Sequence, residues 1–263
     1  TLTEINDRWY GLGTCDMKGF FPIALEAASA FSAGQLKKPL TIVATSDEES
    51  SMAGARHLLA CGKPRADYAI IGEPTGLMPV YAHKGIAFIS IILQGSSGHS
   101  SNPELGNNAL DSMHRVMGEL ISFRQNLAKQ FCNPAFDIQM PTLNLGCLHA
   151  GDNPNRICSK AELQIDLRLL PGMDTAEIIQ VLETQIQRII EPCGTTLTLN
   201  THYPPVPPFS TDLSGDLVKN LAAWSGHAPG TVAFGTEGHF LQSLGMQTVV
   251  FGPGSIDQAH QPN

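Results

Sequence analysis

Residues 41–50, TIVATSDEES, constrain the fold more than any other stretch of the sequence. Small and β-branched apolar residues stop abruptly at three adjacent carboxylates, Asp47, Glu48 and Glu49. An apolar run of this length is typical of a strand that is buried on both faces in a parallel sheet. We therefore predict a buried strand over residues 40–46, with three acidic side chains placed at its carboxyl end.

Two interpretations of these carboxylates remain open from this segment alone. Acidic residues also suit the first turn of a helix, because the helix dipole favours negative charge there. However, two other strand-like runs end near potential metal ligands: residues 67–72 precede Glu73, and residues 248–252 lead to His260. Ligands of open α/β sheets bind outside the carboxyl ends of the strands. Asp, Glu and His gathered there indicate a metal site, and we favour two adjacent metal ions.

The composition excludes several classes of protein. A chain of 263 residues suits one large or two modest domains, and 42% hydrophobic with 15% charged residues is ordinary for a globular protein. A formal net charge of −8, with no Lys/Arg cluster in the sequence, argues against a nucleic-acid partner. No apolar run is long enough to span a bilayer. We therefore expect neither nucleic acid nor a membrane as a partner.

The cysteines favour a reducing compartment. They are scattered, without a CxxC pair, and most have apolar neighbours in the sequence. In a chain of this length such a pattern indicates reduced, buried thiols rather than a disulfide framework. We therefore expect a cytoplasmic protein. The six are Cys15, Cys61, Cys132, Cys147, Cys158 and Cys193.

Residues 1–83 and 204–263 have the pattern of an α/β domain. The first segment alternates helix and strand, which predicts a parallel sheet with crossover helices. The second begins with the Pro-rich run PPVPPF, a stiff linker, and returns to a buried-strand pattern. We predict one discontinuous domain from the two segments. Its expected elements are helices at 20–32, 51–60, 213–224 and 240–244 and strands at 40–46, 67–72 and 248–252.

Residues 84–203 have a different pattern. Their predicted order is strand, helix, strand, strand, helix, strand, which is that of a ferredoxin-like α+β fold. The strand at 161–170 alternates clearly, with Leu163, Ile165 and Leu167 on one face. We predict that this compact module is inserted into the α/β domain. Its expected elements are strands at 85–94, 141–148, 161–170 and 196–203 and helices at 109–127 and 175–190.

Five short motifs occur in an order that resembles a known enzyme family. They are GTCDMKG at 13–19, SDEES at 46–50, GEPT at 72–75, SGHSS at 97–101 and GPGSIDQAHQP at 252–262. Any one of them is a weak signal, but five in order are strong. The chain resembles the dinuclear zinc amidohydrolases, which include acetylornithine deacetylase, succinyl-diaminopimelate desuccinylase, aminoacylase and glutamate carboxypeptidase. The resemblance implies a catalytic domain at 1–83 and 204–263, a lid and dimerisation domain at 84–203, and a homodimer.

The resemblance assigns roles to the acidic residues and to one histidine. Asp16 would bridge two metal ions. Glu49 and His260 would complete the site of one ion, and Glu73 would bind the other. Glu48, beside the ligand Glu49, would be the general base. Carboxylates with a few imidazoles suit Zn²⁺ or Co²⁺, and two adjacent ions can polarise a carbonyl while activating water.

The implied substrate contacts come largely from the lid. His99 resembles the family histidine that reaches across the dimer to stabilise the tetrahedral intermediate. Asn155 and Arg168 resemble the pair that binds the substrate carboxylate, and an arginine can bond a carboxylate in a bidentate manner. Gly235 and Thr236 resemble a substrate-contacting loop. Without the resemblance, a lone loop histidine or an exposed arginine is more often only solvated.

Two further expectations concern the backbone around the site. The resemblance implies a cis peptide bond between Asp16 and Met17. Asp47 is interpreted as a turn or cap residue without a catalytic role, and His239 is left without one.

The motifs AHKG at 82–85 and AHQP at 259–262 point toward the acetylornithine branch of the family. The implied reaction is hydrolysis of the N-acetyl amide of N2-acetyl-L-ornithine, a step of arginine biosynthesis. Two alternatives remain open. The chain could be a sister enzyme that acts on another N-acyl or N-succinyl amino acid, or a metal-poor relative that uses the scaffold only for dimerisation or ligand binding.

The sequence departs from the family pattern before Asp16. The family carries a metal-binding histidine in an upstream HxD motif, and residues 1–15 contain no histidine. It also continues beyond the HQP motif. We expect this chain to be truncated at both ends, to bind at most one zinc ion tightly, to show little or no deacetylase activity, and to expose apolar surface.

Overall fold

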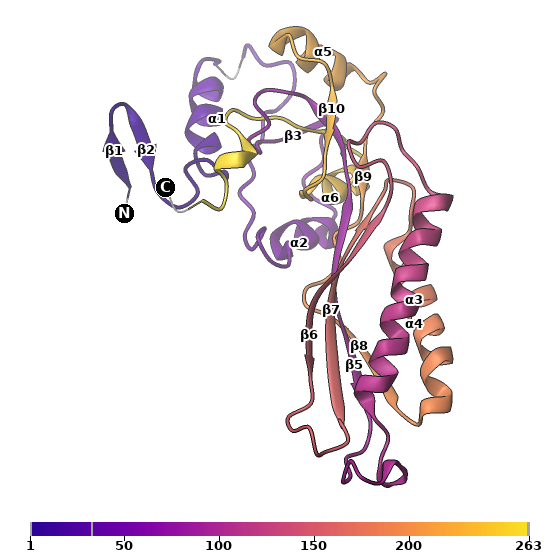
Figure 1. Cartoon of the computed structure of the whole chain (residues 1–263). Helices are drawn as coiled ribbons and strands as arrows, with labels where there is room; N and C mark the ends of the chain where they lie inside the picture. Colours follow the sequence, from indigo (N-terminus) through magenta and orange to yellow (C-terminus); the bar gives the residue numbers. More distant parts are fainter. Residues whose placement is uncertain (1, 33, 262–263) are drawn as a thin grey trace. The chain divides into compact units, whose positions relative to one another are not determined.

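The computed structural model describes residues 2–32 and 34–261 (Figure 1). They form two compact units. Unit 1 comprises Thr1–Ala82, Ser210–Thr231 and Thr236–Asn263, and unit 2 comprises His83–Phe209 and Val232–Gly235. No helix in the described part of the chain is both long and apolar enough to cross a membrane.

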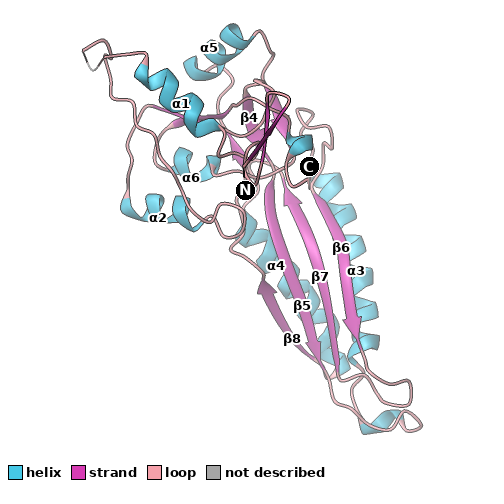
Figure 2. Ribbon diagram, turned by 90° about the vertical axis from the view of Figure 1, so that its left-hand side faces the viewer, coloured by secondary structure: helices cyan, strands magenta, loops and turns pink. Residues whose placement is uncertain are grey.

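Unit 2 contains a four-stranded antiparallel sheet with strand order β6-β7-β5-β8. Its two long helices, α3 and α4, lie along one face of this sheet (Figure 2). The element order β-α-β-β-α-β is the one predicted for this region. The elements are β5 (Gly85–Gln94), α3 (Ala109–Gln130), β6 (Thr142–Ala150), β7 (Lys160–Leu169), α4 (Thr175–Ile190) and β8 (Thr196–Thr201), with short 3₁₀ helices at Pro103–Leu105 and Glu191–Cys193.

The core of unit 2 forms between the helices and the sheet. Alternate residues of β7 face inward, because successive side chains of a strand point to opposite faces; Leu163, Ile165 and Leu167 are buried as predicted. Both helices begin at capping side chains: Asn108 accepts hydrogen bonds from the first turn of α3, and Asp174 does so for α4. The largest fully buried side chains of the layers are Ile89, Ile91, Leu93, Met113, Leu120, Leu182, Ile186 and Ile190.

Unit 1 contains a mixed sheet. The strand order is β10-β4-β11-β3, with β9 paired to β4. β11 runs parallel to β3, as predicted for these two strands, but antiparallel to β4, a strand that the sequence did not predict, so the sheet is mixed rather than parallel. The strands are β3 (Tyr68–Ile71), β4 (Val80–His83), β9 (Phe209–Ser210), β10 (Gly230–Val232) and β11 (Gln247–Val250). The helices are α1 (Phe20–Ser29), α2 (Ala53–Cys61), α5 (Asp216–Ser225) and α6 (Gly238–Ser243), and a hairpin of β1 (Thr3–Ile5) and β2 (Arg8–Tyr10) precedes them.

The strand predicted over residues 40–46 is absent, and this corrects the leading sequence prediction. The segment has no regular secondary structure, and Leu40, Ile42 and Val43 are 57%, 38% and 38% exposed. An apolar run indicates a tendency to be buried, but a strand also needs a hydrogen-bonded neighbour on the sheet. No strand of the described residues pairs with this segment. The apolar composition of residues 40–46 was therefore recognised correctly, but the prediction that they form a strand was wrong.

The expectation of buried thiols is also corrected. All six cysteines lie in the described part of the chain and are free, as predicted, but only Cys158 is buried. Cys61 and Cys132 are exposed, and the other three are intermediate. Apolar neighbours in sequence do not bury a side chain that points to the outer face of its strand or helix.

Candidate metal centre

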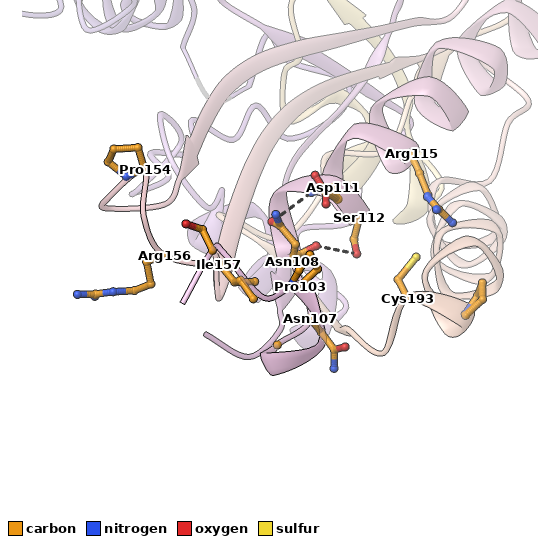
Figure 3. Close-up of a pocket in the computed structure, with 13 residues that line it drawn as sticks. Pro103, Asn107, Asn108, Asp111, Ser112, Arg115, Pro154, Arg156, Ile157 and Cys193 are labelled. Carbon is orange, nitrogen blue, oxygen red and sulfur yellow. Dashed lines mark hydrogen bonds between the residues drawn. The ribbon is translucent and has the colours of Figure 1, made fainter. Parts of the chain in front are cut away.

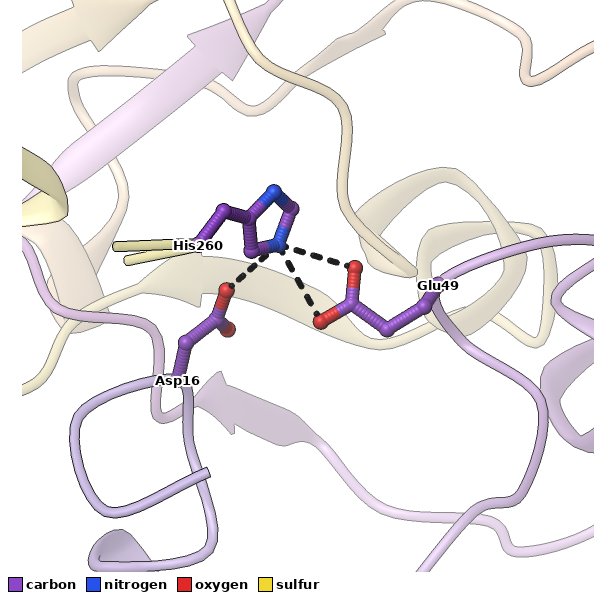
Figure 4. A group of neighbouring side chains, drawn as sticks. All are labelled: Asp16, Glu49 and His260. Atoms are coloured by element: carbon purple, nitrogen blue, oxygen red, sulfur yellow. Dashed lines mark hydrogen bonds and ion pairs between the residues drawn. The ribbon is translucent and has the colours of Figure 1, made fainter. Parts of the chain in front are cut away.

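Three side chains from distant parts of unit 1 converge at one point (Figure 4). His260 Nε2 lies 3.1 Å from Asp16 Oδ2 and 3.1 Å from Glu49 Oε2. One ligand atom from each of the three lies within 4.8 Å of the others, and no other described residues form such a group of three or more. Asp16, Glu49 and His260 were all predicted as ligands of a metal site, and the fold brings them together.

Loops position all three side chains. Asp16 lies in the turn before α1, and the peptide bond from Asp16 to Met17 is cis, as predicted. Glu49 lies in the turn before α2. The carboxylate of Asp47 accepts hydrogen bonds from the hydroxyls of Ser50 and Ser51, which holds that turn. Asp47 thus acts as the turn residue that the sequence indicated.

Glu73 lies just beyond β3 and is 6% exposed. Its carboxyl group is hydrogen-bonded to that of Asp16. Burial raises the pKa of Glu73 to about 9, and repulsion from Glu48 and Asp16 adds to the shift. A nearby cation would stabilise the charged form of a buried carboxyl group that lies beside other carboxylates.

Glu48 faces the same group of charges. Burial raises the pKa of Glu48 to about 7, and repulsion from Glu49, Glu237 and Asp16 contributes, whereas His260 opposes the shift. A carboxyl group that titrates near neutral pH can both accept and return a proton. The pKa of His260 is raised chiefly by the charge of Glu49, with a smaller contribution from Asp16.

Glu237 is a residue of this neighbourhood that the sequence prediction missed. Thr45 Oγ1 donates a hydrogen bond of 3.0 Å to Glu237 Oε2, while Oε1 is buried without a partner among the described residues. Burial raises the pKa of the Glu237 carboxyl. Its position directly after the predicted pair Gly235 and Thr236 was the one available signal.

The donor set fits a divalent metal ion. Asp16, Glu49 and His260 offer two carboxylates and an imidazole, and Glu73 adds a third carboxylate beside Asp16. Oxygen and imidazole ligands of this kind suit Zn²⁺ or Co²⁺. The raised pKa values of Glu48 and Glu73 have the same causes, which are burial first and repulsion between neighbouring carboxylates second. A cation among these groups would offset that repulsion.

The predicted residues of unit 2 lie in two places. His99 and Asn155 lie in adjacent loops, where residue 99 forms an isolated bridge with Arg156 and Asn155 O accepts a hydrogen bond from the backbone N–H of Ser100. Arg168 lies near the opposite end of β7. Lys160, the first residue of β7, and Arg168 are eight positions apart, which corresponds to about 26 Å along an extended strand. The structure therefore does not bring Asn155 and Arg168 of one chain together.

The guanidinium of Arg168 is held by its own strand. Its Nε and Nη2 donate to the two carboxylate oxygens of Asp166 at 2.8 and 3.1 Å, and it lies 5.6 Å above the ring of Phe88. Within the described residues, Nη1 of Arg168 donates no hydrogen bond.

The two remaining predicted substrate contacts, Gly235 and Thr236, are closely packed. Thr236 is fully buried, and its hydroxyl accepts a hydrogen bond from the N–H of Gly238. A Cβ at Gly235 would lie 2.8 Å from Ile86 Cδ1, so a larger residue there would require the Ile86 side chain to move. Pro262, the last residue of the HQP motif, lies outside the described residues.

A hollow of about 430 Å³ occurs in unit 2, beside the start of α3 (Figure 3). None of the predicted site residues lines it, although Ser100 next to His99 does. It is therefore separate from the metal ligands of unit 1.

Comparison with known proteins gives consistent results. Residues 1–263 match the family described as Peptidase family M20/M25/M40. The chain is 45% identical over 263 residues to acetylornithine deacetylase of Aliivibrio salmonicida (strain LFI1238), which covers all of this chain and 69% of that protein.

Two solved structures are similar in fold. Human carnosine dipeptidase 1 superposes with a TM-score of 0.63 at 16% identity, over 97% of this chain and 69% of that one. Aminopeptidase PepT from Bacillus cereus ATCC 10987 gives a TM-score of 0.60 at 19% identity, over 78% of this chain and 53% of that one. The chain thus spans about half of the PepT chain and about two thirds of the other two proteins.

Proposed function

Because this chain belongs to peptidase family M20/M25/M40, a family of hydrolases, we propose that it hydrolyses the N-acetyl amide of N2-acetyl-L-ornithine to ornithine and acetate. The observation that carries the proposal is the convergence of Asp16, Glu49 and His260 beside Glu48. The 45% identity to an acetylornithine deacetylase supports the choice of substrate and, with it, a place in arginine biosynthesis.

The metal would be held by residues of unit 1. Asp16, Glu49 and His260 would bind one zinc ion, and Glu73 together with the second oxygen of Asp16 would contribute to a second. When bound, zinc polarises the amide carbonyl and makes a water molecule a better nucleophile near neutral pH. Cobalt could replace zinc at the same ligands.

Glu48 would move the proton. Its carboxylate takes a proton from the attacking water and returns it to the nitrogen of the leaving amine, so that the amide C–N bond breaks. This role requires a carboxyl group that gains and loses a proton near neutral pH. Before a cation is bound, burial raises the pKa of Glu48 to about 7, and a cation at the neighbouring ligands would lower it toward the carboxylate form that accepts the proton.

The substrate carboxylate would be bound by unit 2, which we propose to be the inserted ferredoxin-like lid. Asp166 and Phe88 hold the guanidinium of Arg168 and leave Nη1 for a ligand. Since Asn155 and His99 lie near the other end of β7, one chain cannot supply all three residues to one substrate. We therefore propose a homodimer in which the partner contributes His99 and Asn155, with Gly235 and Thr236 forming the nearby loop.

Substrate hydrolysis by the full chain tests the proposal. The zinc-loaded protein would be offered N2-acetyl-ornithine, N2-succinyl-ornithine, N-acetylcitrulline and N-acetylmethionine, with long incubations to detect slow turnover. We expect acetate release by this chain to be slow, to be fastest from N2-acetyl-ornithine, and to stop on chelation. A preference for a succinyl or neutral substrate would favour a sister amidohydrolase. Absence of both bound zinc and turnover would favour a non-catalytic relative.

A further inference from the structure

Strand β6 contains an irregularity that changes which side chains face outward. Its register with β7 shifts between Leu145 and Cys147, so Gly146 is an extra residue in a β-bulge. Before the bulge, Leu145 pairs with Ile165 on the inner face. After it, Leu148 pairs with the buried Leu163, although the Leu148 side chain itself is 41% exposed. Cys147 and His149 consequently lie together on the outer face of the sheet.

The thiol and the imidazole are in direct contact. His149 Nε2 lies 3.0 Å from Cys147 Sγ. His149 is directly opposite Glu162 in the register of β6 and β7, and the two are close enough for their charges to interact. The arrangement is a nucleophile beside a base, with a carboxylate beside the base.

The carboxylate is itself held in place. Ser90 Oγ donates a hydrogen bond of 2.9 Å to Glu162 Oε1, and Gln164 Nε2 donates one of 3.3 Å to the same oxygen. These bonds, that of Gln164 first, lower the pKa of Glu162. Glu162 is therefore ionised at neutral pH and places a negative charge beside His149.

Small molecules can approach this cluster. His149 and Glu162 line a hollow of about 270 Å³, together with Asp152 and Lys160. Cys147 itself is partly exposed. The hollow lies entirely in unit 2, so it is distinct from the metal ligands.

We propose that Cys147 is the reactive thiol of this protein, a modification site for peroxides and other small uncharged electrophiles that is activated by His149 and Glu162. His149 accepts the thiol proton, and the thiolate attacks one oxygen of the peroxide. An S–O bond forms as the O–O bond breaks. The departing hydroxide takes the proton from His149 and leaves as water, so sulfur is oxidised to a sulfenic acid and the peroxide is reduced. The proposal is independent of the hydrolase activity.

The other cysteines provide an internal comparison. Cys61 and Cys132 are more exposed than Cys147. Cys61 also has a histidine nearby, but His57 Nε2 lies 3.4 Å from its sulfur, compared with 3.0 Å between His149 Nε2 and Cys147 Sγ. If exposure alone decided reactivity, Cys61 and Cys132 would react first. Activation by the cluster predicts the reverse order.

The test is the rate of alkylation of each thiol in the full chain. The protein would be treated with iodoacetamide at pH 7, quenched at intervals, and mapped by mass spectrometry of its peptides. We expect Cys147 to react at least about tenfold faster than Cys61 and Cys132, since the thiolate is the nucleophile. Hydrogen peroxide followed by a cyclic diketone should trap the sulfenic acid at Cys147 first.

Variants separate activation from exposure. His149→Gln should slow the alkylation of Cys147 about tenfold and leave Cys61 unchanged, and Glu162→Gln should slow it by a smaller factor, about two- to threefold. His57→Gln, the matched control, should not affect Cys147. The proposal is wrong if Cys147 reacts no faster than Cys132, or if His149→Gln leaves its rate unchanged while the circular dichroism spectrum remains that of the parent.

Discussion

Units 1 and 2 differ in how fully their secondary structure is covered. In unit 2 both helices place an apolar stripe on the sheet, and residues such as Leu120 and Ile186 are fully buried. In unit 1, α1 has no buried residue, and Tyr68 and Ile70 of β3 are 49% and 45% exposed. The predicted metal ligands all lie on loops of this less covered unit. The contrast indicates that unit 2 buries its apolar surface more completely than unit 1, in which local opening should therefore cost less free energy.

The largest expected effect separates chemistry from packing within unit 1. Glu48→Gln should reduce acetate release by about 10²–10⁴-fold while zinc content stays at the wild-type level, because Glu48 is assigned to proton transfer and not to metal binding. Glu49→Gln should instead lose zinc. Metal analysis and an acetate assay on both variants check this.

Glu183→Gln is the matched control, since Glu183 is an exposed carboxylate of α4 in unit 2. It should change neither zinc content nor turnover. Equal loss of zinc in the Glu48 and Glu49 variants would contradict the division of roles between them.

The next effect tests the packing contrast directly with one type of substitution. Ile186→Ala removes a fully buried side chain of unit 2 and should lower the free energy of unfolding by about 2–5 kcal/mol. Ile42→Ala removes a side chain that is 38% exposed in unit 1 and should cost less than about 0.5 kcal/mol. Denaturant unfolding measures both. Similar losses would mean that residues 40–46 are buried in solution.

Zinc should stabilise the two units unequally. At a free concentration one hundred times its dissociation constant, a ligand that binds only the folded state contributes about 2.7 kcal/mol. Hydrogen exchange should therefore slow in the loops around Asp16, Glu49 and His260 on addition of zinc, and amides of α3 should exchange as before. Equal slowing in α3 would show that the units do not respond separately.

The smallest effect on stability concerns the exposed edge of the unit 1 sheet. Ile70→Lys should change the free energy of unfolding by less than about 0.5 kcal/mol, because Ile70 is 45% exposed. It should nevertheless reduce aggregation and the fluorescence of an apolar dye, since a lysine on an edge strand opposes pairing with other chains. Ile121→Lys on α3 is the control and should alter dye fluorescence less. An equal decrease in both variants would remove the distinction between the two surfaces.

The same contrast explains what the sequence could predict. The helix over 175–190 and the strand over 85–94 were predicted with the bounds that the structure has, because each carries the periodicity of an element packed on one face. Residues 40–46 pair with no strand of the described residues, so their apolar composition alone predicted a strand that does not form. Pairing depends on residues distant in sequence, which periodicity does not report.

The site was predictable only through motifs. Asp16, Glu49 and His260 come together from loops that are far apart in the sequence, and no local pattern gives their distances. Glu237 was missed because burial of a carboxyl next to Glu48 is a property of the folded chain. Likewise, the contact between Cys147 and His149 on the outer face depends on a register shift that the sequence does not announce.

The bulge at Gly146 determines to which face of the sheet each later side chain of β6 points. If Gly146 instead paired opposite Gln164 in a regular ladder of the present length, Cys147 would pair with Leu163 and turn toward the helices, and His149 would follow it. Deletion of Gly146 would leave Cys147 opposite Gln164 and His149 opposite Glu162, because the bulged residue has no partner of its own. Removal of this residue is therefore expected to be milder than a loss of the bulge at the present strand length. The outward direction of Cys147 and His149 and the register of β6 with β7 thus depend on the same bulge.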